Sequence, residues 1–130
     1  MTTIWHNPSC STSRRVLQML QEGGETPEVI DYRETPPDRD SLRQWIADAG
    51  LTVRQALRQR NTPYHDLGLG DPELTDEQLL DSILAHPILL ERPFVRTPLG
   101  TRLCRPPERV LEIMANPPVL PSTQDGPPPA

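Results

Sequence analysis

Two hydrophobic periodicities divide the first half of the chain into predicted strands and helices. Residues 2–6 and 28–32 are short β-prone segments and are predicted to be strands. Between them, residues 12–22 place apolar side chains at helical spacing and stop at Gly23-Gly24, which predicts a helix. A second helix is predicted after Asp38, a suitable N-cap; its apolar positions are Leu42, Trp45, Ile46 and Ala49, and Gly50 ends it. The chain therefore opens in the order β-α-β-α.

The second half begins with a helical region and closes with a hairpin. Thr75 to Ala85 is predicted to be a helix, because Thr75 and Gln78 have the spacing of a capping box. Residues 93–97 and 101–104 are predicted to be short strands joined by Pro98-Leu99-Gly100. A last helix is predicted from Pro106-Pro107 through Met114.

The order of these elements predicts an α/β protein with a thioredoxin-like fold that carries a helical insertion at about residues 51–90. A right-handed crossover would pair the first two strands in parallel, and the hairpin would add antiparallel strands. Residues 1–115 are expected to form one domain, because 130 residues suffice for a single modest core. Residues 116–130 are rich in proline and lack a pattern, which predicts an irregular tail.

Composition and charge narrow the range of functions. A net charge of −5 argues against a nucleic-acid partner. No apolar run has the length of a membrane span and the N-terminus lacks a signal-peptide pattern, so we expect no membrane association and a cytoplasmic location. Two cysteines, Cys10 and Cys104, are too few for a disulfide scaffold. All 13 cationic residues are arginine and none is lysine. A bias in genome composition explains most of these arginines.

Cys10 is the residue that most directly indicates chemistry. It lies between the end of the first predicted strand and the start of the helix at residues 12–22. Unpaired backbone amides and the helix dipole favour an anion at such a junction, so they lower the pKa of a thiol and can also hold an oxyanion. A small buried cysteine is the alternative interpretation. The junction favours the nucleophilic one.

The neighbours of Cys10 extend this interpretation. His6, four residues earlier, could stabilise the thiolate as a cation or hydrogen-bond partner, or could be a structural histidine. The hydroxyl residues at positions 11–13 could cap the helix or donate hydrogen bonds to the sulfur. Ser13 stands where a redox dithiol needs its second cysteine, so an external thiol or the distant Cys104 must resolve an oxidised Cys10.

Three arginines occupy distinctive positions: Arg58 in the helical insertion, Arg92 before Pro93, and Arg105 before Pro106. In a thioredoxin-like fold the proline before the third strand is commonly cis and faces the reactive cysteine, and Arg92-Pro93 fits that place. Guanidinium groups bind tetrahedral oxyanions through paired hydrogen bonds. Spacing alone does not distinguish these three arginines from solvated surface charges.

Three segments of the chain closely resemble the glutaredoxin-coupled arsenate reductases. They are residues 4–14 around Cys10, residues 54–58 followed by Pro63-Tyr64 and Leu67-Gly68-Leu69, and residues 86–93 followed by residues 97–106. The resemblance runs from about residue 3 to residue 114 with nearly constant spacing. Ser11 departs from it, because some members have glycine there.

This resemblance implies an enzyme that reduces arsenate to arsenite. It implies that Cys10 is the nucleophile, that His6 helps to activate the thiol, and that three arginines bind the oxyanion, namely Arg58, Arg92 and Arg105. The resemblance further implies that glutathione, as co-substrate, and a glutaredoxin resolve the thiol–arsenate adduct. Neither a bound cofactor nor a metal ion is expected.

Two other functions remain open from the sequence. Thiol-sensing transcription regulators of the same fold family bind RNA polymerase. They typically carry a Cys-X-X-Cys switch, which Ser13 interrupts, and they lack the full set of arginines. A thiol-transfer protein with no role in arsenate chemistry is the second alternative, because an oxyanion pocket does not by itself identify its oxyanion.

Overall fold

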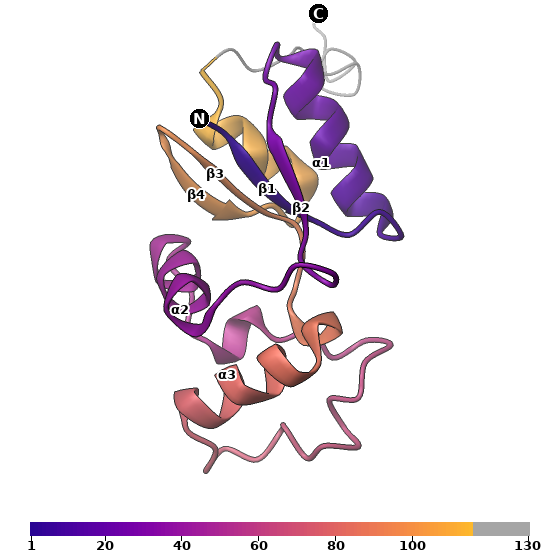
Figure 1. Cartoon of the computed structure of the whole chain (residues 1–130), viewed down its shortest axis with the longest axis vertical. Helices are drawn as coiled ribbons and strands as arrows, with labels where there is room; N and C mark the ends of the chain where they lie inside the picture. The colour runs from indigo at the N-terminus through magenta and orange to yellow at the C-terminus, as the bar shows by residue number, and fades with distance from the viewer. Residues whose placement is uncertain (116–130) are drawn as a thin grey trace, which may run out of the picture.

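The computed structural model describes residues 1–115, in which a four-stranded mixed sheet has helices on both faces (Figure 1). The strands are β1 (Thr3–His6), β2 (Glu28–Asp31), β3 (Phe94–Thr97) and β4 (Gly100–Leu103), in the order β2-β1-β3-β4. β1 pairs in parallel with β2 and antiparallel with β3, and β3 and β4 form the antiparallel hairpin. This topology confirms the thioredoxin-like α/β fold predicted from the order of the elements.

Most of the helices begin where the sequence predicts. The α-helices are α1 (Ser11–Glu22), α2 (Arg39–Asp48) and α3 (Asp76–Ala85), and the short 3-10 helices are η1 (Arg54–Ala56), η2 (Pro87–Leu89) and η3 (Pro107–Ile113). Asp38 caps α2 by accepting the Ser41 N–H at 2.7 Å, and Thr75 forms the predicted capping box with Gln78. The last predicted helix is a 3-10 helix, η3. None of the helices among residues 1–115 is long and apolar enough to cross a bilayer.

Alternate residues of β1 point to opposite faces of the sheet and join two separate cores. Ile4 is packed with Val95 beneath α1 and η3. Trp5 lies on the other face and stacks on Trp45 of α2, with ring centroids 4.0 Å apart. Apolar contacts on both faces therefore hold β1, which fixes where the chain leaves the sheet after His6.

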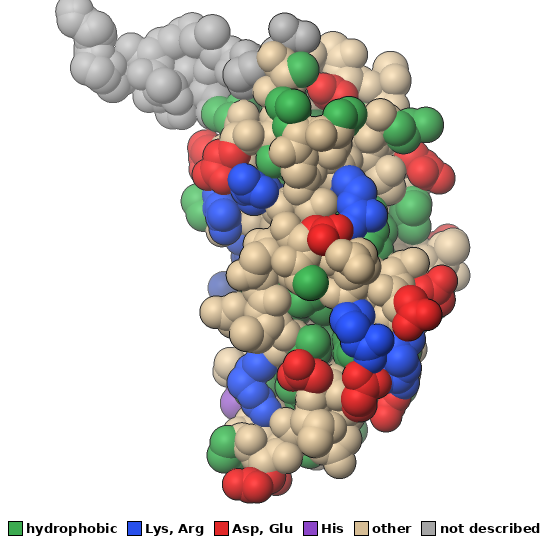
Figure 2. Space-filling view, turned by 90° about the vertical axis from the view of Figure 1, so that its left-hand side faces the viewer, with side chains coloured by type: hydrophobic (Ala, Val, Ile, Leu, Met, Phe, Trp, Pro, Cys, Tyr) green, Lys and Arg blue, Asp and Glu red, His purple; other side chains and the backbone are tan. Residues whose placement is uncertain are grey.

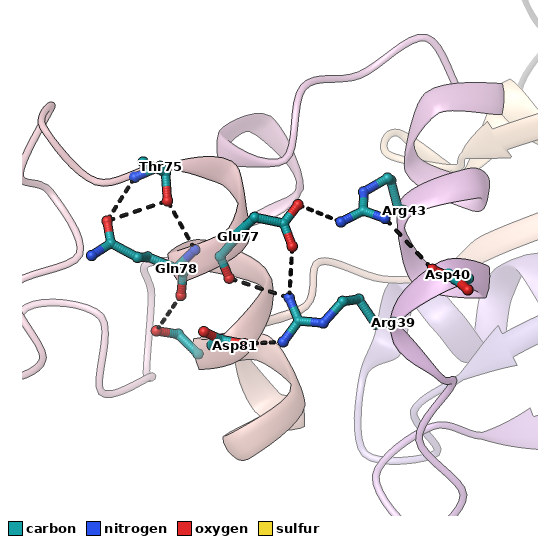
Figure 3. Close-up of polar contacts among 8 residues, drawn as sticks. Arg39, Asp40, Arg43, Thr75, Glu77, Gln78 and Asp81 are labelled. Carbon is teal, nitrogen blue, oxygen red and sulfur yellow. Dashed lines mark hydrogen bonds and ion pairs between the residues drawn. The ribbon is translucent and has the colours of Figure 1, made fainter.

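The helical insertion is attached to α2 by a surface network of ion pairs (Figure 3). Arg39 pairs with Glu77 at 3.2 Å and also with Asp81, and Arg43 pairs with Glu77. The two acidic side chains are exposed and the two arginines are partly exposed, so each pair adds about 1 kcal/mol or less. On the face shown in Figure 2, arginine and acidic side chains lie next to one another. The charge on this face is therefore mixed.

The two ends of the insertion are joined by backbone hydrogen bonds. The Arg58 N–H donates to the Leu89 carbonyl at 2.7 Å, and the Glu91 N–H donates to the Ala56 carbonyl at 2.9 Å. Leu57 and Leu90 form the isolated antiparallel bridge between them. Arg58 thereby lies beside the segment that leads into β3. The predicted tail at residues 116–130 lies outside the described residues, and the single domain at residues 1–115 stays a prediction.

Candidate active site at the N-terminus of α1

Cys10 is the N-cap residue of α1, immediately after the turn that follows β1. Its backbone is extended, with φ −98° and ψ 122°, and its N–H donates to the Asn7 carbonyl at 2.9 Å. Asn7 also accepts the Ser9 N–H through Oδ1 at 2.9 Å, which closes the turn. No side-chain oxygen caps α1 at Cys10, so the first-turn amides of the helix face the Cys10 sulfur.

The environment of Cys10 favours its thiolate form. Burial raises the pKa of the Cys10 thiol, but this effect is outweighed by the Ser13 N–H, the Arg92 side chain and the Thr12 N–H, so its pKa lies below the ordinary value. Helix-terminal amides and a guanidinium stabilise a thiolate for the same reason that they bind other anions. Cys10 therefore has a larger reactive thiolate fraction at neutral pH than an ordinary cysteine.

His6 reaches Cys10 only indirectly. Its Nδ1 lies 2.6 Å from the hydroxyl of the fully buried Ser13, and the same hydroxyl accepts the Asn7 N–H at 3.0 Å. Burial lowers the pKa of His6, while Asp31 opposes that shift in part, so the imidazole is largely neutral at pH 7. His6 is placed to hold Ser13, whose N–H points at the sulfur. Of the alternatives that the sequence left open for His6, this hydrogen bond favours the structural one.

Cys10 opens into a cleft that is rich in arginine. The cleft has a volume of about 490 Å³ and is lined by Ser9, Cys10, Ser11, Thr12, Arg58, Arg60, Asn61, Arg92 and Arg105. The structure thus brings together Cys10 and the three arginines selected from the sequence, which come from three separate parts of the chain. Arg105 Nη1 lies 3.9 Å from the Cys10 sulfur, and the Arg92 side chain also interacts with it.

Backbone carbonyls hold two of these arginines in the cleft. Arg92 donates through Nη1 to the carbonyls of Ile88 and Leu90, at 3.0 and 3.3 Å. Arg105 donates through Nη1 to the Arg92 carbonyl at 3.0 Å. The peptide bonds Arg92–Pro93 and Arg105–Pro106 are both cis, the first as expected for this fold. Arg92 is 7% exposed, and its buried Nε is without a hydrogen-bond partner among residues 1–115.

Glu91 is a functional candidate that the sequence analysis did not select. Its Oε1 lies 3.1 Å from Arg58 Nη1 and 3.8 Å from Arg105 Nε, so one carboxylate oxygen contacts two of the cleft arginines. This contact offsets the repulsion between two guanidinium groups that would otherwise face each other without an anion. Its position next to Arg92 was the only sequence signal available. The fourth arginine of the cleft, Arg60, was also missed.

Cys104 and the histidines offer no second reactive centre in the described part of the chain. Cys104 is completely buried beneath α1, and burial raises the pKa of its thiol to about 12. It is therefore protonated at neutral pH and shielded from solvent. Among residues 1–115, no three histidine, cysteine or acidic side chains are grouped to hold a metal ion. The cleft around Cys10 combines a nucleophilic sulfur with donors for a tetrahedral oxyanion.

Comparisons with known proteins place this site in a family. The ArsC family model matches residues 5–113. The chain belongs to the ArsC family. An arsenate reductase of Rhizobium meliloti (strain 1021) is 56% identical over 125 residues, covering 96% of this chain and 85% of that protein. An arsenate reductase of Escherichia coli (strain K12) is 53% identical over 124 residues, covering 95% of this chain and 84% of that protein.

Solved structures of ArsC-like proteins have the same fold. The structure of an arsenate reductase from Vibrio cholerae superposes with a TM-score of 0.82 at 42% identity, covering 86% of this chain and 96% of that one. The match covers most of both chains, so the two proteins share their overall fold.

Proposed function

We propose that this protein is an enzyme that reduces arsenate to arsenite, with Cys10 as its nucleophile. The observation that carries the proposal is the position of Cys10, a thiol of lowered pKa at the N-terminus of α1 with Arg105 Nη1 3.9 Å from its sulfur. The names of the relatives support arsenate as the oxyanion.

In the first step the Cys10 thiolate attacks the arsenic of dihydrogen arsenate. A sulfur–arsenic bond forms, one oxygen takes up a proton and leaves as water, and arsenic stays in the +5 state. Arg58, Arg92 and Arg105 bind the remaining oxygens and stabilise their charge, together with the first amides of α1.

In the second step an external thiol, glutathione, attacks the Cys10 sulfur of the adduct. A sulfur–sulfur bond forms and the sulfur–arsenic bond breaks, leaving its electron pair on arsenic, which is released as arsenite after protonation. Arsenic gains two electrons, and each of the two sulfurs gives one. A glutaredoxin thiol then exchanges with the mixed disulfide, takes the glutathione and returns the Cys10 thiol.

An external resolving thiol agrees with the surroundings of Cys10. Ser13 occupies the position of a second redox cysteine, and Cys104 is completely buried in the core beneath α1, where burial raises the pKa of its thiol to about 12. Thiol-sensing transcription regulators of this fold family typically carry a Cys-X-X-Cys switch. Serine at position 13 interrupts that motif, which disfavours a regulatory function for this protein. We further propose that the enzyme works in the cytoplasm, where thiols are kept reduced, and that it needs no bound cofactor.

The test is arsenate-dependent oxidation of NADPH with glutathione, glutathione reductase and a glutaredoxin. We expect turnover by the native protein, loss of turnover in Cys10→Ser, and most of the turnover in Cys104→Ser, its matched control. Serine is nearly isosteric with cysteine but is a far weaker nucleophile at neutral pH. Substantial turnover by Cys10→Ser would refute the proposed mechanism. Turnover with glutathione that ceases in Cys104→Ser would replace it with an internal disulfide route.

A further inference from the structure

The cleft contains a fourth arginine, Arg60, to which the chemistry above gives no role. Arg60 lines the cleft next to Asn61 and is exposed at its opening. Arg58, Arg92 and Arg105 each donate to a carboxylate or carbonyl of the protein. The Arg60 guanidinium has no such partner within residues 1–115, where only its backbone carbonyl takes part in a hydrogen bond.

The turn that carries Arg60 is well defined. Asn61 has φ 58°, in the left-handed region that asparagine tolerates better than most residues. The Thr62 hydroxyl lies 2.8 Å from the Arg58 carbonyl and 2.9 Å from that of Gln59. Arg58 in turn donates through Nε to the Arg60 carbonyl at 3.2 Å. The backbone of Arg60 is therefore tied to an arginine of the oxyanion site, and its side chain extends from a fixed point.

The direction of approach decides what Arg60 can bind. Once an oxyanion contacts Arg92, Arg105 and the helix amides, the cationic group left at the mouth of the cleft is Arg60. Cys10 lines this cleft together with Arg60, so a resolving thiol that reaches its sulfur through the cleft passes near Arg60. Glutathione has a carboxylate on each side of its thiol: the glycine carboxylate lies one residue along the chain from the central cysteine, at roughly 3.5 Å per residue, and the carboxylate of the γ-linked glutamate lies farther away. A carboxylate can therefore lie at the rim while the sulfur approaches Cys10.

We propose that Arg60 binds a carboxylate of the thiol co-substrate and so selects an anionic thiol over a neutral one. This inference rests on the proposed function, since it concerns the second step of that reaction. Arg60 acts on the binding of the reductant, whereas Arg58, Arg92 and Arg105 act on the oxyanion. The planar guanidinium suits a carboxylate because it can donate two parallel hydrogen bonds.

The experiment uses the full chain in a single turnover without glutaredoxin, so that only the resolving step is measured. The protein is loaded with arsenate and mixed with glutathione or with glutathione diethyl ester, which has the same thiol and no carboxylate. Released arsenite and the mixed disulfide on Cys10 are followed over time. For Arg60→Gln we expect the rate ratio of glutathione to its ester to fall by about two- to fivefold, the effect of losing one exposed charge pair.

Arg15→Gln is the matched control, because it removes the same charge from α1 at a position that does not line the cleft. We expect its ratio to stay close to that of the native protein. Arg60→Lys, which keeps the charge, should recover part of the lost preference. The inference about Arg60 is overturned if the rate ratio is unchanged in Arg60→Gln, or if it falls equally in Arg15→Gln. In either case, release of arsenite by the native protein would still support the proposed function. If the native protein releases no arsenite with either thiol, the proposed function fails and this inference fails with it.

Discussion

Replacing Ser13 by alanine tests how the site is built into the fold. The Ser13 hydroxyl is fully buried and serves two partners, accepting the Asn7 N–H at 3.0 Å and lying 2.6 Å from His6 Nδ1. A hydroxyl can donate to the unprotonated Nδ1 of a neutral imidazole while it accepts an N–H. Alanine would leave both partners buried and unpaired.

The expected cost follows from those two partners. His6 is 7% exposed and Asn7 is 1% exposed, so water cannot readily replace the lost hydroxyl. Each buried polar group left without a partner costs about 1–3 kcal/mol, so two such groups cost about 2–6 kcal/mol in Ser13→Ala. Domains have about 5–15 kcal/mol of stability, so a loss below about 5 kcal/mol leaves the variant folded. Urea denaturation should show a lower midpoint and an unchanged slope.

Ser11→Ala is the control, because Ser11 is exposed in the same helical turn as Ser13. This substitution should change the free energy of unfolding by less than about 0.5 kcal/mol. A double-mutant cycle with His6→Phe sharpens the test. The two substitutions remove one shared contact, so the pair should cost about 1 kcal/mol less than the sum of the single variants. Equal stability of Ser13→Ala and Ser11→Ala, or strict additivity with His6→Phe, would refute the proposed link from Ser13 to His6.

Three further outcomes are expected. Arg92→Lys keeps a charge but loses the paired donors, so kcat/KM for arsenate should fall by about tenfold or more; a smaller loss would mean that charge alone suffices. Glu91→Gln removes a negative charge beside Arg105 and should lower the pKa of Cys10 further, measured as the midpoint of its alkylation against pH; a rise would contradict the geometry. The thiol of Cys104 has a pKa of about 12 in the fold against about 8.5 when unfolded, so its contribution to stability is complete below about pH 8.5 and is lost as pH rises toward 12. Between pH 8 and pH 10 the free energy of unfolding should therefore fall less in Cys104→Ala than in the native protein. An equal fall in the two proteins would refute the raised pKa of Cys104.

The fold was largely predictable because its signals are local. The capping box at Thr75, the N-cap at Asp38 and the stop at Gly23-Gly24 each act within one helical turn, and each helix lies where these residues indicate. The position of Cys10 at the start of α1 follows from the same local rules. The order of strands and helices then restricts the topology, since a right-handed crossover leaves few ways to pair β1 with β2.

The role of His6 was not predictable in the same way. His6 lies four positions before Cys10, and the sequence left open whether it stabilises the thiolate or is a structural histidine. The turn after β1 instead directs Nδ1 to Ser13, one helical turn beyond Cys10. Burial also lowers the pKa of the His6 imidazole. This shift depends on how the side chains pack around the site, so it could not be predicted from the spacing of residues in the sequence.

Glu91 and Arg60 show why charged residues of the cleft are the hardest to predict. The chain has 13 arginines, and residue type does not separate the four that line the cleft from the rest. What separates them is the backbone bridge between Leu57 and Leu90, which joins the insertion to the segment before β3. This bridge places Glu91 against Arg58 and leaves the turn at Arg60 facing the same opening as Cys10. Because the bridge links residues more than thirty positions apart, no local pattern encodes it, and the charge balance of the site becomes apparent only in the folded chain.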